Sequence, residues 1–240
     1  MLTQIYMELY KFKRSKILWV IIALLVIHVL WSFIQASTRS LSWDVFLNSQ
    51  YMNLWIRPSF FTFLSGYIFV RDYEERSIGT LLTYPFSRSH WYLSKLITAF
   101  CIISLIIMIN FAFDLVIGIL LLGQPLTLSI VGNQLVFLIE TVLLYSALIP
   151  LSATLGILLR KYVLCVVASV FVVMISTLFG ASPKYITLDP WLLPYLFSHY
   201  PQNLPEISLW TPGVYISIII VVSGGLLGYY RYINTDVFNH

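Results

Sequence analysis

The chain has 240 residues, of which 59% are hydrophobic and only 10% are charged, and its mean hydropathy is +0.87. This composition excludes a soluble globular domain, because such domains carry far more charge. The net charge of +4 is uninformative as a total, so the positions of the charges carry the argument. Several apolar runs approach the roughly 20 residues needed to cross a bilayer, which predicts an all-α polytopic membrane protein.

Residues 1–16 precede the first long apolar run and are predicted to form an amphipathic helix. One side is apolar at helical spacing, with Leu2, Ile5, Leu9 and Phe12. The opposite side is polar, with Gln4, Glu8, Lys11 and Ser15. Basic residues gather at the end of this segment, so we expect a helix in the cytoplasmic interface of the membrane. The simpler alternative is an ordinary basic flank that only helps to set the topology.

Six transmembrane spans are expected within one transmembrane domain, residues 1–240. Their approximate bounds are 17–34, 52–70, 96–122, 133–159, 162–181 and 213–230. The second is weakened near its start by Arg57-Pro58, and Pro150 is expected to bend the fourth. The pair Gly224-x3-Gly228 in the sixth would permit close approach of another helix.

The distribution of Lys and Arg predicts the orientation of these spans. One set of connections, with the N-terminal segment and the end of the sixth span, carries eleven basic residues: Lys11, Lys13, Arg14, Lys16, Arg71, Arg76, Arg88, Lys95, Arg160, Lys161 and Arg231. The other set carries three: Arg39, Arg57 and Lys184. Both termini are therefore expected in the cytoplasm. The longest external connection, residues 182–212, is rich in proline and aromatic residues, which is typical of an interfacial cap or an external gate.

A charged segment, residues 71–95, separates the second and third spans and is predicted to be cytoplasmic. Asp72 to Ile78 could form a short helix across the membrane face. Gly79 can end such a helix, and Pro85 with Ser87 favours a turn. A segment of this kind can pass the motion of an attached partner to the two flanking spans. A solvated loop without a partner is the alternative.

Four polar residues are expected within the membrane: Arg57, Asn110, Asp114 and Glu140. A charged side chain at this depth costs roughly 2.5–3.5 kcal/mol on insertion scales, which indicates pairing or function. Three interpretations remain open: an ion pair or network of Arg57 with one or both acids, the lining of a polar cavity, and proton coupling through Asp114 or Glu140. His28 in the first span is expected to hydrogen-bond to a neighbouring helix.

Motifs for catalysis are not recognisable in the chain. There is no Gly-x4-Gly-Lys-Ser/Thr phosphate loop, no Gly-x-Ser-x-Gly and no His-Glu-x-x-His. Glu74-Glu75 invites comparison with the Glu-Glu-x3-Arg motif of intramembrane proteases, but Gly79 stands where that motif needs arginine. The histidines lack ligand spacing, and Cys101 and Cys165 are expected to be packing residues. We therefore expect no enzyme activity, no metal and no cofactor.

The order of these elements resembles that of ABC-2 type permeases. In that family a basic elbow helix and two spans precede an acidic residue leading into Gly-Thr, then Pro-x-Ser-Arg, a Lys and four more spans. The matching residues here are Glu74 or Glu75, Gly79, Thr80, Pro85, Ser87, Arg88 and Lys95. In size the chain looks most like permeases of bacitracin export or lantibiotic immunity.

The resemblance implies that residues 71–95 dock on a separate ATPase subunit. The residues expected to make this contact are Asp72, Glu74, Glu75, Arg76, Gly79, Thr80, Pro85 and Arg88. It further implies a second permease copy or a homologous permease, contact with membrane lipids but not nucleic acid, a bacterial plasma-membrane location, and export of a peptide antibiotic or similar amphipathic cargo. The alternative is an ion-coupled secondary transporter or channel that uses Asp114 and Glu140.

Overall fold

The computed structural model describes residues 1–38, 42–49, 56–180, 182, 185–193 and 212–234, and these are all helical or short connections. The helices are α1 (Leu2–Lys13), α2 (Ile17–Thr38), α3 (Trp43–Ser49), α4 (Ile56–Glu74), α5 (Ile78–Leu82), α6 (Arg88–Leu121), α7 (Leu128–Ala147), α8 (Ile149–Leu159), α9 (Tyr162–Gly180), the 3₁₀ helix η2 (Ile186–Leu188) and α11 (Pro212–Asn234). Most of the external connection predicted at 182–212 lies outside the described residues.

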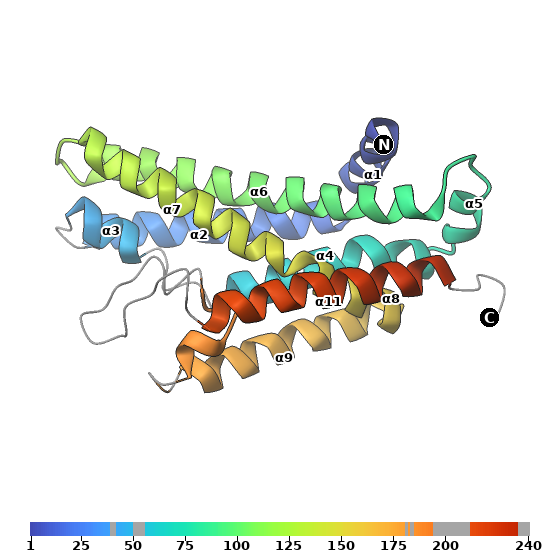
Figure 1. The fold of residues 1–240 in the computed structure, drawn as a ribbon. Helices are drawn as coiled ribbons and strands as arrows, with labels where there is room; N and C mark the ends of the chain where they lie inside the picture. Colours follow the sequence, from blue (N-terminus) through green and yellow to red (C-terminus); the bar gives the residue numbers. More distant parts are fainter. Residues whose placement is uncertain (39–41, 50–55, 181, 183–184, 194–211, 235–240) are drawn as a thin grey trace.

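The long helices run roughly parallel to one another in a single bundle, while α1 crosses this direction near one end (Figure 1). The end that carries α1 also carries α5 and the last turn of α11 (Figure 1). Two hydrogen bonds join other elements at this end: Arg88 at the start of α6 donates from Nη1 to the Ile233 carbonyl of α11 at 2.6 Å, and Glu74 Oε1 of α4 accepts from the Tyr162 backbone N–H of α9 at 3.1 Å. The elbow, segment 71–95 and the α8–α9 junction therefore share one end of the bundle, as the charge distribution predicted. Which side of the membrane this end faces stays a prediction.

Five stretches are long and apolar enough to cross a membrane, with α7 and α8 counted together: Ile17–Ser37, Arg88–Leu121, Leu128–Leu159, Tyr162–Gly180 and Pro212–Asn234. The second predicted span corresponds to α4, which does not qualify, so the count of six stays a prediction. Charged residues stand near both ends of α4. Its interior residues are buried against other helices, Leu64 and Val70 completely. A helix surrounded by protein rather than lipid does not need an apolar surface all round.

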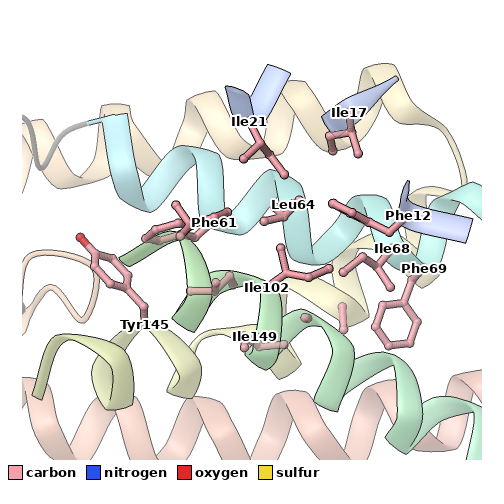
Figure 2. Close-up of a cluster of buried hydrophobic side chains, with 14 of the residues drawn as sticks. Phe12, Ile17, Ile21, Phe61, Leu64, Ile68, Phe69, Ile102, Tyr145 and Ile149 are labelled. Carbon is pink, nitrogen blue, oxygen red and sulfur yellow. The ribbon is translucent and has the colours of Figure 1, made fainter. Parts of the chain in front are cut away.

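The main core lies where α4 meets α6 and α8 (Figure 2). Phe61, Leu64, Ile68 and Phe69 of α4 pack there with side chains of α6, α8 and α2, and Phe12 of α1 reaches in from the elbow (Figure 2). Phe12 is the one residue of the predicted apolar stripe that is buried. It is one of the contacts that hold α1 against the bundle.

Small residues allow α8 to approach both α4 and α11. A Cβ on Gly156 would lie 2.6 Å from the carbonyl oxygen of Gly66 in α4, and one on Gly224 would lie 2.8 Å from the Leu151 backbone nitrogen. The close approach expected at Gly224 is confirmed. At Pro150, where a bend was expected, the helix is interrupted: α7 ends at Ala147 and α8 begins at Ile149. The matching contact at Gly66 was not predicted.

Helix α1 is amphipathic as predicted, but its polar side faces the protein. Gln4 and Glu8 are fully buried, whereas Leu2 is 85% exposed and Leu9 is 40% exposed. The sequence pattern alone does not decide which side of α1 meets the protein, and in the structure it is the polar side. The physical reason is that basic side chains of α4 and α6 stand under α1 and pair with Glu8, as described next.

Candidate functional site

Five charged side chains from three helices meet where α1 crosses α4 and α6. We call them the charge cluster: Glu8 and Lys11 of α1, Arg71 and Asp72 of α4, and Lys95 of α6. Glu8 Oε2 accepts from Arg71 Nη2 at 2.9 Å, and Glu8 Oε1 lies 3.2 Å from Lys95 Nζ. Lys95 also pairs with Asp72 and donates to the Ile68 carbonyl at 3.2 Å. Lys11 Nζ bridges the two carboxylates at 3.3 Å each. The cluster thus joins the elbow to both helices that flank segment 71–95.

The cluster is buried, and this decides its electrostatics. Lys95 is completely buried, and Glu8, Arg71 and Asp72 are nearly so. Burial by itself would raise the pKa of Asp72, but the neighbouring Lys95 and Lys11 hold it at about 2. Buried ion pairs are weak evidence for net stability, yet removing one partner leaves an uncompensated charge and is costly. The two carboxylates and three cations therefore depend on one another.

Asp72 also shapes the chain reversal that begins segment 71–95. Helix α4 runs to Glu74, and Arg76 follows in the left-handed conformation at φ 51°. The Ser77 backbone N–H donates to the Asp72 carbonyl at 3.0 Å and the Arg76 N–H to the Tyr73 carbonyl at 3.2 Å, which is the Schellman pattern of helix ends. The short helix expected at Asp72–Ile78 is therefore wrong. Because α4 ends inside that range, the short helix forms later, as α5.

The tip of segment 71–95 is exposed, unlike its base. Glu75, Thr80 and Pro85 are exposed, and a Cβ on the half-exposed Gly79 would meet nothing within 4 Å. After the turn at Pro85, Ser87 caps α6 by accepting from the His90 backbone N–H at 3.4 Å. The residues predicted to dock a partner are thus divided between surface and interior.

Most of the predicted docking residues lie at this surface: Glu74, Glu75, Arg76, Gly79, Thr80 and Pro85. Asp72 belongs to the charge cluster, and the half-buried Arg88 bonds to α11. Glu74 has a local role too, because it accepts from the first N–H of α9.

A groove of about 590 Å³ adjoins this tip, and we call it the elbow groove. It is lined by the α1–α2 turn, by Glu74 and Glu75 at the end of α4, and by Tyr67 and Tyr162, whose rings stack 5.1 Å apart. Arg14 and Lys16 of the α1–α2 turn add positive charge to its lining. The groove therefore offers both signs of charge next to the exposed tip.

In the part of the chain that the structure describes, the polar residues predicted within the membrane do not form the ion pair with Arg57 that was the first of the three interpretations. Asp114 is buried and accepts from Ser32 Oγ at 2.7 Å, and His28 Nε2 lies 3.1 Å from each of its carboxylate oxygens. The expectation that His28 bonds to a neighbouring helix is confirmed. Within the described parts of the chain, no ion pair joins Arg57 to Asp114 or to the half-buried Glu140. Arg57, Asn110 and Asp114 instead line one small hollow.

Sequence reasoning missed the role of Glu8, Lys11 and Arg71. A signal was available, because Gln4, Glu8 and Lys11 follow one another at spacings of four and three and so form a polar stripe along one side of the helix. A stripe of this kind can face either water or buried charges. The described residues contain no group of three or more His, Cys, Asp or Glu side chains that could hold a metal ion.

Comparisons with known proteins show the family of the chain. The family model described as ABC-2 family transporter protein matches residues 4–176, which covers α1 to α9 and so includes the charge cluster, segment 71–95 and the residues around Asp114. The chain is also similar to the bacitracin transport permease protein BCRB of Bacillus licheniformis. The two are 27% identical over 164 residues, which are 66% of this chain and 77% of that protein. The chain is thus a multi-pass plasma-membrane protein, and it belongs to the ABC-2 family of transporter proteins.

Proposed function

We propose that the chain is the membrane-spanning subunit of an ATP-driven exporter, and that its ATPase subunit docks on the exposed tip of segment 71–95. The observation that carries the proposal is the division of this segment into an exposed tip and a buried base. The tip is open to a partner, while the base is locked through Asp72 and Lys95 to α1, α4 and α6. A push on the tip would therefore move three helices together.

The elbow groove extends the proposed docking surface. A partner that contacts Glu75 and Thr80 would also reach this groove, whose lining holds both acidic and basic side chains. Charge pairs at such an exposed rim steer association and set register more than they add affinity. The ATPase is placed on a separate subunit because the chain has no recognisable phosphate loop.

The cargo is proposed to be a peptide antibiotic or a similar amphipathic molecule, moved away from the cytoplasm. This rests on the likeness to a bacitracin transport permease, which covers about two thirds of the chain. A second permease copy or a homologous permease would complete the pathway.

The docking surface can be tested by filling it without disturbing the fold. A Gly79→Trp change places a large side chain where nothing lies within 4 Å of the Cβ, so the protein should still fold. The tagged chain, purified from its native membrane in mild detergent, should retain an ABC ATPase that mass spectrometry identifies. The Gly79→Trp variant should lose it, and Glu75→Ala should weaken it.

Gly132→Trp is the matched control, because this glycine in α7 also has open space around it but lies away from α5. Equal loss of ATPase in both variants would refute the docking site. Failure of the unmodified chain to retain any ATPase would refute the proposed function itself. Transport by the isolated chain that depends on an ion gradient would favour the ion-coupled alternative through Asp114 and Glu140.

A further inference from the structure

The bundle contains a half-open pocket of about 320 Å³ between α2, α4 and α6. This volume lies at the lower end of the range of small-molecule sites. Most of its wall is apolar, formed by Ile21, Leu24, Leu25, Ile27, Trp31, Phe60, Phe61 and Ile106. Its polar groups are His28, Arg57 and Asn110.

Arg57 has no acidic partner among the residues that the structure describes. No described carboxylate lies within 4.0 Å of its guanidinium as an ion pair. Asp114 lines the adjoining hollow, but its oxygens are already engaged by His28 and Ser32. The Asn110 Oδ1 atom beside Arg57 is buried and has no hydrogen-bond partner among the described residues. A guanidinium cannot lose its charge by deprotonation. Because an unpaired charge is costly in an apolar bundle, binding of an anion beside Arg57 would be favourable.

The mouth of the pocket lies on the apolar outer side of α2. Two lining residues of α2 are exposed, Ile27 by 59% and Trp31 by 40%. Because α2 is long and apolar enough to cross the membrane, an opening along its exposed side faces lipid rather than water. A ligand that enters here has to be soluble in the bilayer.

We infer that this pocket binds an anionic amphiphile that has a single unbranched apolar chain, and that the acidic head of this amphiphile pairs with Arg57. The apolar wall would hold the chain, and the guanidinium would hold a phosphate or carboxylate head through charge-assisted hydrogen bonds. The claim that the bound amphiphile is the exported cargo rests on the proposed export function. The claim that the pocket binds an anionic amphiphile does not. The pocket would then load cargo from within the membrane.

The test uses the purified full-length chain in detergent, with no ATPase present. The probe is a lysophosphatidic acid that carries a photoactivatable diazirine in its acyl chain. A monoacylglycerol with the same chain is the uncharged control, and inorganic phosphate serves as a competitor. We expect saturable labelling of α2, α4 or α6 peptides by the anionic probe, weak labelling by the monoacylglycerol and no competition by phosphate.

Two pairs of variants sharpen the test. Arg57→Gln should weaken binding of the anionic probe about tenfold or more, and Arg57→Lys should weaken it less, since it keeps the charge but not the paired donors. Leu24→Trp should block the pocket. Val26→Trp is its control, because Val26 lies two residues away, is exposed and does not line the pocket. Size-exclusion profiles establish that each variant is folded.

The inference is overturned if Arg57→Gln binds the anionic probe as well as the native chain, or if the monoacylglycerol labels equally. Effective competition by phosphate alone would identify a site for small anions instead and overturn it too. If Arg57→Gln does not fold, Arg57→Lys and Leu24→Trp still decide the outcome. Because labelling by the probe needs no partner subunit, a negative labelling result would not affect the co-purification of the ATPase. Loss of the ATPase would likewise not affect the labelling result.

Discussion

The charge cluster and the polar residues around Asp114 both place charge inside an apolar bundle, yet they are built in opposite ways. In the cluster, Glu8 and Asp72 meet three cations from three helices, and each charge has a partner of the opposite sign. Around Asp114 the acid is satisfied by His28 and Ser32, while Arg57 nearby has no acidic partner among the described residues. The charge cluster, in which every charge is paired, suits a rigid joint between helices. The region around Asp114, in which Arg57 is left available, suits a binding site.

The largest expected effect is at the centre of the charge cluster. A Lys95→Met change removes the buried cation that Glu8 and Asp72 share, so Asp72 keeps only the more exposed Lys11 as an ion-pair partner. We expect it to lower the free energy of unfolding by about 3 to 5 kcal/mol. Denaturant titration of the purified protein in detergent measures this, with Lys161→Met on the exposed α8–α9 junction as the control. That control should stay within about 0.5 kcal/mol of the native protein. A similar loss in both variants would show that the cluster is not a joint.

A smaller effect is expected from acid. The pKa of Asp72 is about 2 in the folded protein, below its ordinary value, so its stabilising contribution is complete well above that ordinary value. The contribution is lost as the pH falls toward 2, and it amounts to something on the order of 2 kcal/mol. Unfolding free energies measured from pH 6 down to pH 3 should fall more steeply for the native chain than for Asp72→Asn. Equal slopes would mean that Asp72 is not held as an ion in the folded state.

The smallest effect distinguishes the partners of Asp114. A double-mutant cycle between His28→Ala and Asp114→Ala should give a coupling energy of about 1 kcal/mol, the usual size for a hydrogen bond. The cycle between Arg57→Ala and Asp114→Ala should give clearly less, because no ion pair joins those two residues. Both are read from unfolding in detergent. A larger coupling to Arg57 would remove the contrast between the two regions and weaken the case for the pocket.

Much of the helical framework could be predicted from the chain alone. Long apolar runs predicted each of the five described stretches that are long and apolar enough to cross a membrane. Pro150 indicated where α7 gives way to α8. The second predicted span is less apolar because α4 is lined by protein, and a hydropathy pattern cannot tell a buried polar surface from an exposed one. The short helix expected from Asp72 was misplaced for a related reason, since Asp72 is held by Lys95, 23 residues away in sequence.

The candidate site was only partly predictable. The exposed docking residues of segment 71–95 could be named because their order resembles a family pattern, while their role in docking stays a prediction. The partner of Asp114 is different, because His28 is 86 residues away and nothing local relates the two. Arg57 was expected to pair with Asp114 because arginine carries a permanent positive charge. The packing of α2 on α6 places His28 and Ser32 at the carboxylate instead.

What the sequence by itself determined is the class of protein, the positions of most helices and the sharing of one end by the basic connections. These follow from the apolar content and charge of continuous stretches, which are properties of neighbouring residues. Only the tertiary structure decided that α1 turns its polar side inward, that Glu8, Asp72 and Lys95 form one cluster, and that Arg57 faces an apolar pocket. The reason is that an amphipathic pattern defines two sides of a helix, whereas which side is buried depends on the charges that other helices place beneath it.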